Sequence, residues 1–325
     1  MRVFSGVRPT GELHIGNYLG AIKQWVELQN KNECLFCIVD LHAITTPYDQ
    51  RKLPDDIIDT ALSYLAVGLN PEKCILFVQS QVKEHTELAW LLGTITPLGE
   101  LQRMTQFKEK ARKHKKYINA GLLNYPILMV SDILLYQTDM VPIGEDQKQH
   151  VELARTIARK FNQRFGKTFK EPKTLLPQMG AKIMSLQNPK KKMSKTDEPR
   201  GCIDLFDEPE EIQKKIMSAL TDTGKVIKYD LERKPGMANL LTIYSLFSGK
   251  TIKEIEKKFK GKGYSEFKKS LARLLINSLE PCQRKRKELL TREVYIKEIL
   301  SQGAKKAQVL AQSTIQEVRK KMGFV

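Results

Sequence analysis

The first 190 residues alternate short apolar runs with stretches whose apolar residues recur at helical spacing. Val3–Gly6, Cys34–Val39, Cys74–Val78 and Met140–Ile143 are the predicted strands. The predicted helices of this part cover residues 15–29, 57–67, 84–92, 99–111, 122–136 and 146–162. Such alternation is typical of a parallel sheet with helices on both faces. We therefore expect an α/β fold with a Rossmann-like, doubly wound parallel sheet, whose ligands bind beyond the carboxyl ends of the strands.

Strand signals vanish from about residue 205. The remaining predicted helices cover residues 209–220, 238–247, 252–259, 267–279 and 304–322. The expected division is a Rossmann-like catalytic domain over residues 1–204, with a helical insertion around residues 80–125, and an all-helical domain over residues 205–325. The helical part holds 26 Lys and Arg against 15 Asp and Glu, a net +11 of the total +18. This excess favours a polyanionic partner; the alternative is a lysine-rich proteome that decorates every helix.

Several classes of protein are disfavoured by composition. The longest apolar runs are too short to span a bilayer, so no membrane association is expected. The N-terminus lacks the zones of a signal peptide, which favours the cytoplasm. Five cysteines in 325 residues do not form a disulfide framework. Cys34 and Cys37 lie in a predicted buried strand, so we interpret them as core thiols rather than metal ligands.

The segment Pro9–Asn17 (PTGELHIGN) follows the first predicted strand and begins a helix. Thr10 and His14 would lie where free N–H groups and the helix dipole form an anion site. Gly16 in the first helical turn would let a flat ligand such as adenine lie on the backbone. The segment is neither a P-loop nor a G-x-G-x-x-G motif, which disfavours a kinase or a dehydrogenase.

The segment Lys190–Thr196 (KKKMSKT) lies about 180 residues further on and presents ammonium groups. A basic cluster is usually a solvated face, but the preceding residues 181–185 suggest a strand end that feeds a clasp over phosphates. Neither segment contains a nucleophile beside a base. The implied chemistry is displacement at phosphorus, catalysed by positioning the substrates and by neutralising charge as pyrophosphate leaves.

These two segments resemble the His-Ile-Gly-His and Lys-Met-Ser-Lys-Ser signatures of class I aminoacyl-tRNA synthetases. The resemblance to the bacterial-type tryptophanyl-tRNA synthetase family is closer and extends over nearly the whole chain. It is carried by residues 39–45, 104–110, 125–126, 131–136 and 144–155. The tyrosine-specific relatives share the signatures but have a different pattern in these middle segments.

The resemblance implies ATP-dependent activation of L-tryptophan, with Mg²⁺, followed by transfer to the terminal ribose of the cognate tRNA by a homodimer. It implies catalytic roles for His14, Lys110, Lys192 and Lys195. The implied ATP-binding residues are Arg8, Pro9, Thr10, Gly16, Asn17, Gly144, Glu145, Asp146, Ile183, Lys192, Met193, Ser194, Lys195 and Thr196. The implied tryptophan-binding residues are Phe4, Gly6, His42, Tyr125, Met129, Asp132, Val141, Ile143 and Gln147.

Asp132 also stands out without the resemblance, because a single carboxylate in the apolar stretch 127–136 is costly to bury unless it meets a donor. Indole nitrogen donates a hydrogen bond and cannot accept one. The alternative is a donor from the protein itself. Three residues depart from the commoner patterns: Asn17 replaces a His, Thr196 replaces a Ser, and Arg8 stands where many relatives carry Gln. A planar cation at Arg8 could reach a phosphate or the substrate carboxylate.

The other candidates are expected to be structural. His85 and His114 are interpreted as surface residues, Trp25 and Trp90 as packing aromatics, and His150 as a capping or core histidine. Anticodon binding by the helical domain would involve basic side chains, with Lys214, Lys215, Arg284, Lys285 and Arg286 as candidates. Three alternative functions stay open: a tyrosine-specific relative, a small-molecule nucleotidyltransferase, and a non-catalytic RNA-binding relative.

Overall fold

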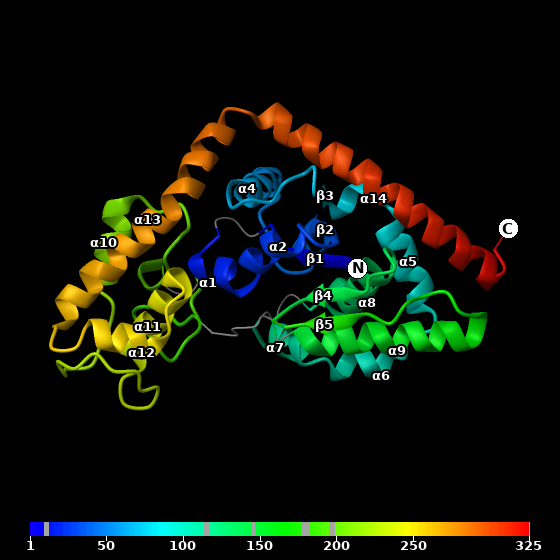
Figure 1. Cartoon of the computed structure of the whole chain (residues 1–325). Coiled ribbons are helices and arrows are strands. Elements are labelled where there is room, and N and C mark those ends of the chain that lie inside the picture. Colours follow the sequence, from blue (N-terminus) through cyan, green and yellow to red (C-terminus); the bar gives the residue numbers. More distant parts are fainter. Residues whose placement is uncertain (10–12, 114–117, 145–146, 177–182, 195–198, 325) are drawn as a thin grey trace. The chain divides into compact units, whose positions relative to one another are not determined.

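The chain folds around a parallel β-sheet, which Figure 1 shows for the computed structural model. The structure describes residues 1–9, 13–113, 118–144, 147–176, 183–194 and 199–324, without the side chains of residues 110, 111 and 113. The strands are β1 (Arg2–Val7), β2 (Glu33–Ile38), β3 (Cys74–Val78), β4 (Met140–Pro142) and β5 (Lys173–Leu175). They pair in parallel in the order β3-β2-β1-β4-β5, so the predicted Rossmann-like sheet is confirmed.

The strand order creates a switch point between β1 and β4. The chain adds β2 and β3 on one side of β1 and then returns to the other side for β4 and β5. Ligands of such sheets bind near this point, beyond the carboxyl ends of the strands. The sequence did not predict β5, because this strand has only three residues and begins with the exposed Lys173, so it lacks an apolar run.

Helices cover the sheet, and their apolar faces form its core. They are α3 (Asp40–Ala43), α4 (Leu53–Ala66), α5 (Glu84–Gly93), α6 (Leu98–Arg103), α7 (Thr105–Lys113), α8 (Ala120–Leu134), α9 (Lys148–Phe165) and α14 (Glu293–Met322). The predicted helix over residues 99–111 is divided at Met104, whose side chain is buried. On α9 the predicted apolar face is buried as expected, through Val151, Ala154, Ile157, Ala158 and Phe161.

Helix α14 lies along β3, the strand at one edge of the sheet (Figure 1). A Cβ added to Gly303 would lie 1.9 Å from the carbonyl oxygen of Leu76, so glycine is needed for this close backbone approach. Ala304, Ala307 and Ala311 continue the buried surface of small residues. The helix therefore shields the strand edge that would otherwise be open to pairing with another chain.

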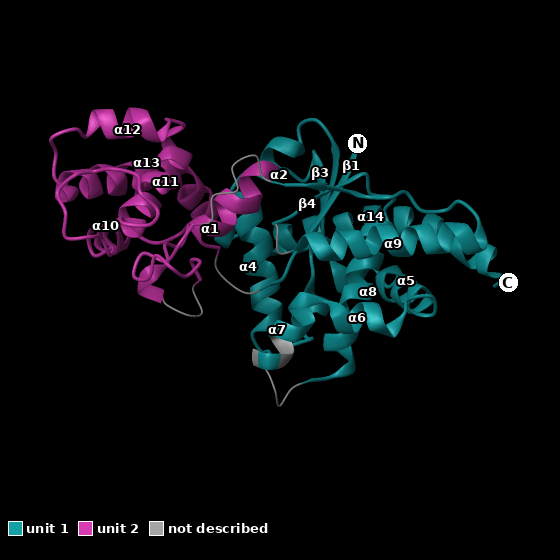
Figure 2. Cartoon of the chain, turned by 90° about the horizontal axis from the view of Figure 1, so that it is seen from below, with its two compact units in different colours: residues 1–11, 25–178, 289–325 teal, residues 12–24, 179–288 magenta. Residues whose placement is uncertain are grey.

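A second compact unit contains residues 12–24 and 179–288, which Figure 2 shows in magenta. Its helical elements are α1 (Ile15–Asn17), the π-helical turn η1 (Tyr18–Ile22), the start of α2 (Lys23–Leu28), η4 (Pro199–Gly201), α10 (Pro209–Met217), α11 (Pro235–Ser248), α12 (Ile252–Lys258) and most of α13 (Tyr264–Leu290). The rings of Tyr244, Phe259 and Phe267 pack with centroids 5.1–5.7 Å apart. These contacts join α11, α12 and α13 into one core.

The two units do not follow the division expected at residue 204. Unit 1 contains residues 1–11, 25–178 and 289–325, and unit 2 contains the rest. Residues 289–325 group with the sheet because α14 packs on β3. Residues 12–24 group with unit 2 because backbone hydrogen bonds join Ile15 to Ile203 and Leu205 to Leu13. The functional division into catalytic and anticodon-binding parts stays a prediction.

Candidate active site

His14 caps the helix that begins at Ile15. Its Nδ1 accepts hydrogen bonds from the backbone N–H groups of Gly16 at 3.0 Å and Asn17 at 3.3 Å. The Asn17 side-chain oxygen accepts the backbone N–H of His14 at 3.2 Å, which completes a capping box. These three bonds hold the imidazole in one orientation at the start of the helix.

The capping bonds also determine where the proton of His14 lies. Because Nδ1 accepts, the neutral ring must carry its proton on Nε2, which is then a hydrogen-bond donor. Burial lowers the pKa of His14 to about 4; Asp204 opposes this shift and Lys192 adds to it. Near neutral pH the side chain is therefore an uncharged donor at a helix N-terminus, suited to an anionic oxygen.

Gly16 leaves room for this arrangement. A Cβ added there would lie 2.8 Å from both Nδ1 and Cε1 of His14, so a larger residue would displace the imidazole. The same added atom would lie 3.7 Å from Cβ of Ile183. The structure thus brings Gly16 next to Ile183, a residue 167 positions further along the chain that was predicted to contact adenine.

Residues 183–193 form a hairpin-like segment that presents the Lys-Met-Ser part of the second motif. Met193 N donates to Ile183 O, and Ser185 N donates to Lys191 O, both at 2.9 Å. Asn239 on α11 anchors the segment by exchanging hydrogen bonds with the backbone of Met184 at 2.9 and 2.8 Å. Lys192 is exposed while Met193 is 2% exposed, so the ammonium group faces solvent and the thioether packs inside.

Asp132 lies in unit 1, on α8, and is only 2% exposed. Its Oδ2 is 2.8 Å from Nε2 of His42, while its Oδ1 is 2.7 Å from Nε2 of Gln79 and 2.6 Å from Nδ1 of His85. Burial raises the pKa of Asp132, but the hydrogen bonds from His42 and His85 outweigh it and lower the pKa to about 2. The carboxylate is therefore ionised and acts only as an acceptor.

His85 is not a surface residue, so that prediction was wrong. It is 0% exposed, and its Nε2 lies 2.7 Å from the hydroxyl of Tyr136. Tyr136, His85 and Asp132 thus form a buried chain of hydrogen bonds. The sequence offered one overlooked signal: Gln79 directly follows β3, at the sheet edge where ligands of parallel sheets bind.

Asp132 keeps capacity for one more donor. A carboxylate offers about four lone-pair positions, and three are taken by His42, Gln79 and His85. The remaining position is on Oδ2, which accepts only from His42 among the described residues. The alternative raised by the sequence, that Asp132 meets donors of the protein itself, is therefore correct. The carboxylate still has one lone-pair position for a further donor.

The other residues of the predicted tryptophan set lie in unit 1 around the switch point. Phe4 and Gly6 are on β1, Val141 is on β4, and Ile143 directly follows it. Phe4 stacks on Tyr136 with ring centroids 5.6 Å apart. Met129 and Tyr125 are on α8, and Gln147 precedes α9.

His150 is a core histidine, as predicted. It is 1% exposed, and its Nε2 lies 3.3 Å from the hydroxyl of Tyr125. The Tyr125 ring in turn meets His42 edge-on at 6.3 Å. This packing links the predicted tryptophan-binding residues to the buried face of α9.

Arg8, just after β1, contacts a neighbouring loop of the same unit. Its Nη2 donates to the carbonyl of Ala43 at 2.9 Å and to the hydroxyl of Thr46 at 2.8 Å. Its buried Nε has no partner among the described residues. The guanidinium is therefore anchored through Nη2 within unit 1, while its Nε–H is left without a partner in the described part of the chain.

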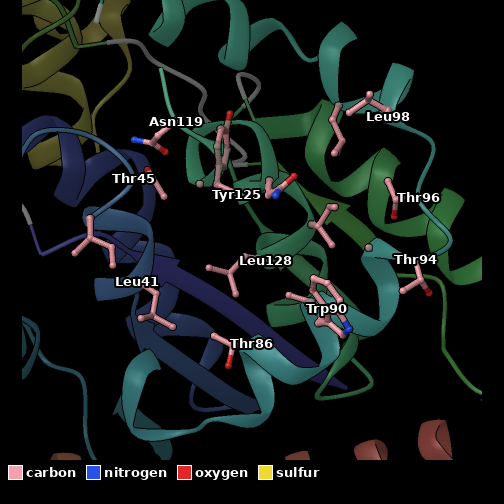
Figure 3. A pocket seen from close by; sticks show the side chains of 17 residues that line it. Leu41, Thr45, Thr86, Trp90, Thr94, Thr96, Leu98, Asn119, Tyr125 and Leu128 are labelled. Carbon is pink, nitrogen blue, oxygen red and sulfur yellow. The ribbon is translucent and has the colours of Figure 1, made fainter. Parts of the chain in front are cut away.

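An apolar groove of unit 1, whose lining includes Tyr125 of the predicted tryptophan set, has a volume of about 740 Å³. Figure 3 shows Trp90, Leu128, Leu98 and Tyr125 among the side chains that line it. Trp90 is 77% exposed, so the prediction of a packing role was wrong for Trp90, whereas Trp25 is buried as predicted. An exposed indole beside an apolar groove is typical of a surface that binds another molecule.

Several predicted site residues lie outside the described part of the chain: Thr10, Glu145, Asp146, Lys195, Thr196, the side chain of Lys110, and also His114. In the described ranges, no group of three or more His, Cys, Asp or Glu side chains could hold a metal ion. All five cysteines are free, and the interpretation of Cys34 and Cys37 as core thiols is confirmed by their burial. None of the described helices is long and apolar enough to cross a membrane.

The chain has a doubly wound parallel sheet, and it brings the His-x-Gly start of a helix next to a Lys-Met-Ser hairpin. Together these features define a class I aminoacyl-tRNA synthetase. The chain belongs to the family described as tRNA synthetases class I (W and Y), which matches residues 1–280. It is 52% identical to the tryptophan–tRNA ligase of Caldanaerobacter subterraneus subsp. tengcongensis, across 100% of this chain and 98% of the relative.

Two crystal structures agree with this assignment. The tryptophanyl-tRNA synthetase of Mycoplasma pneumoniae superposes with a TM-score of 0.89 at 35% identity, covering 100% of this chain and 98% of the other. The enzyme of Campylobacter jejuni complexed with ADP and tryptophan superposes with a TM-score of 0.84 at 38% identity, covering 100% of both chains.

Proposed function

We propose that the chain is a tryptophan–tRNA ligase, which activates L-tryptophan with ATP and esterifies the 3′-terminal ribose of its tRNA. The observation that carries the choice of amino acid is the buried, ionised Asp132, which retains one acceptor position. Indole N–H fills that position, whereas phenylalanine leaves it unpaired. Full-length similarity to tryptophan–tRNA ligases supports this choice over tyrosine specificity and over a small-molecule nucleotidyltransferase.

In this proposal His14, Gly16, Ile183 and Lys192, all of unit 2, contact ATP. Nε2–H of His14 donates to a phosphate oxygen, Gly16 and Ile183 bracket the adenine, and the ammonium group of Lys192 neutralises charge on the leaving diphosphate. No covalent enzyme intermediate is needed: the tryptophan carboxylate attacks the α-phosphorus, and pyrophosphate departs. Catalysis then rests on positioning and on donors already oriented before the reaction.

The remaining ATP contacts are assigned by resemblance. Arg8, Pro9, Asn17, Gly144, Met193 and Ser194 lie in the described ranges and complete the proposed set. Thr10, Glu145, Asp146, Lys110, Lys195 and Thr196 are proposed for the ribose and phosphates. Mg²⁺ enters as a companion of the phosphates. It would spread the negative charge of the departing diphosphate.

The second step of the reaction requires a macromolecular partner. The activated tryptophan is transferred to its tRNA, and the helices of unit 2 contribute the binding of the anticodon arm. We place this activity in the cytoplasm, where thiols stay reduced, because all five cysteines are free.

Tryptophan-dependent exchange between pyrophosphate and ATP tests the proposal. The purified chain should exchange label with tryptophan and ATP in the absence of tRNA, and exchange with tyrosine should be at least about a thousandfold less efficient. Equal exchange with both amino acids would contradict the assignment of specificity. Exchange with neither, but with another small carboxylate, would favour the nucleotidyltransferase.

We also propose that the enzyme is a homodimer, and that a second copy of this chain covers the apolar groove of unit 1. The groove is flanked by large exposed side chains: Trp90 is 77%, Leu98 56% and Ile44 40% exposed. Trp90→Glu should shift the sedimenting species from a dimer to the 37.3 kDa monomer. A wild-type chain that sediments as a monomer at micromolar concentration would contradict the homodimer.

A further inference from the structure

Six lysines of unit 2 surround one hollow, which we call the lysine hollow. Its volume is about 790 Å³, and it is bordered by residues 224–228, by α12 and by residues 259–264. The lysines that line it are Lys225, Lys228, Lys253, Lys257, Lys260 and Lys262. All six are exposed, so their ammonium groups can reach a ligand in solvent.

The positive charge of the lysine hollow is largely uncompensated. Lys262 pairs with Glu266 at 2.5 Å, and it is the only one of the six with an ion pair among the described residues. Glu256 is the one acidic residue of the lining. Its Oε1 accepts a hydrogen bond from the backbone N–H of Tyr229, with an N–O distance of 2.6 Å. Like charges held this close attract a layer of counter-ions, and a polyanion that displaces this layer binds with a gain in entropy.

The wall of the lysine hollow is held in place by a hydrogen-bonded network. Nζ of Lys234 donates to Oδ2 of Asp222 and to the hydroxyl of Tyr264, both at 2.9 Å, and to the carbonyl of Val226 at 3.1 Å. The Tyr264 hydroxyl donates to Asp222 at 2.8 Å. This network ties the loop at residues 224–228 to the start of α13, so the lysines are presented on a preformed surface.

The basic residues suggested from sequence for RNA binding are differently placed. Lys215 pairs with Asp207 at 2.6 Å, with only 13% of its side chain exposed, and Arg286 lies 4.4 Å over the ring of Phe206. Lys214 and Lys285 each have an acid of their own helix within 4 Å. Lys215 and Arg286 are therefore already engaged in contacts within unit 2, and Lys214 and Lys285 each have a nearby acid, whereas five of the six lysines of the hollow have no ion pair among the described residues.

We propose that the lysine hollow binds the phosphodiester backbone of the tRNA substrate; the partner follows from the proposed function. Val226, 66% exposed, lines the hollow, and the neighbouring Tyr229 is 37% exposed. A nucleotide offers both a phosphate for the ammonium groups and a base face for such side chains. An inorganic polyphosphate would use the lysines alone.

The test removes two charges from one wall. In Lys253→Gln/Lys257→Gln, both substitutions are on the exposed side of α12, and glutamine preserves helix propensity. The KM for tRNA in aminoacylation should rise about tenfold at physiological salt. The slope of log affinity for tRNA against log salt concentration should fall by about 1.5, for two lost phosphate contacts. Tryptophan-dependent exchange, which needs no tRNA, should stay within about twofold of wild type.

The matched control is Lys269→Gln/Arg273→Gln, which removes the same charge from two exposed positions four residues apart on α13, outside the hollow. Its KM for tRNA should change less than about twofold. Equal effects of the two pairs would show a general effect of net charge and overturn the proposal, as would a hollow pair with unchanged KM. If tripolyphosphate binds wild type but not the hollow pair while the KM for tRNA is equal in both, the hollow is a small-anion site instead.

A second pair in the loop at residues 224–228, Lys225→Gln/Lys228→Gln, repeats the measurement independently of α12. Wild-type exchange with tryptophan tests the proposed function alone. If the wild-type chain catalyses tryptophan-dependent exchange but neither pair of substitutions in the hollow raises the KM for tRNA, only the role of the hollow is refuted.

Discussion

Replacing His14 with alanine is expected to lower kcat for tryptophan-dependent ATP–pyrophosphate exchange about 100-fold, with a much smaller effect on the KM for tryptophan. The neutral imidazole presents Nε2–H to a phosphate oxygen, and loss of one oriented donor to a developing negative charge typically costs about 100- to 1,000-fold in kcat. Steady-state exchange kinetics measure both parameters.

His14→Asn separates the two roles of this residue. Asparagine is among the best N-cap residues, so its side-chain oxygen can replace Nδ1 as the acceptor for Gly16 and Asn17. Its NH₂ group is a donor, but it lies on Cγ and does not reach the position that Nε2–H occupies on the far side of the imidazole ring. We therefore expect His14→Asn to be nearly as impaired in kcat as His14→Ala but to unfold at a higher denaturant concentration. Recovery of exchange in His14→Asn would mean that only the cap matters.

The titration of His14 supplies a second readout. Folding lowers the pKa of this side chain from 6.5 to about 4, so the unfolded chain binds the proton more readily. The stability that neutral His14 contributes is therefore present above about pH 6.5 and is lost as the pH falls toward about 4. The difference in unfolding free energy between wild type and His14→Asn should shrink over that range. A constant difference would contradict the buried, neutral state of His14.

Asp132→Asn is expected to lower kcat/KM for tryptophan about tenfold or more, while the KM for ATP barely changes. The amide can keep its oxygen toward Gln79 and His85, which occupy Oδ1 in the native protein. Its NH₂ group then replaces Oδ2 and meets the indole N–H donor to donor. Asparagine is preferable to alanine here, because alanine would leave three buried donors unpaired and confuse binding with unfolding.

The matched control for this substitution is Asp139→Asn. Asp139 accepts from the backbone N–H of Arg2 and from Lys170, and it precedes β4 at the amino end of the strand. Its loss should affect stability alone. If Asp139→Asn and Asp132→Asn change kcat/KM for tryptophan to the same extent, Asp132 has no specific role in recognising indole.

The order of apolar and polar residues in the sequence was sufficient to predict most of the secondary structure. The residue types of the two motifs were sufficient to predict that they act together. The strand at Cys74–Val78 was predicted at its observed bounds, because it is apolar and followed by polar residues. The strand at Lys173–Leu175 escaped prediction, since a short edge strand need not be apolar. The helix ending at Met322 begins at Glu293 rather than Ala304, and its first turns already bury Ile296, Ile299 and Leu300.

Local patterns could not show which distant side chains meet. The sequence around His85 does not distinguish a surface histidine from a buried one. In the structure its imidazole donates to a buried carboxylate 47 residues away. The sequence around Trp90 does not distinguish it from an aromatic residue of the core, yet in the folded chain Trp90 is exposed. Lys215 and Lys257 both lie in the last turn of an α-helix, yet only Lys215 has a carboxylate oxygen at 2.6 Å.

The sequence by itself determined the fold class, the two signature segments and the family, because these depend on short-range periodicity and on residue types at fixed spacing. Only the tertiary structure decided that His14 is a neutral donor, that Asp132 shares its charge with two histidines and a glutamine, and that α14 belongs with the sheet. Burial and the choice of hydrogen-bond partner depend on chain segments tens to hundreds of residues apart, and no local pattern records them.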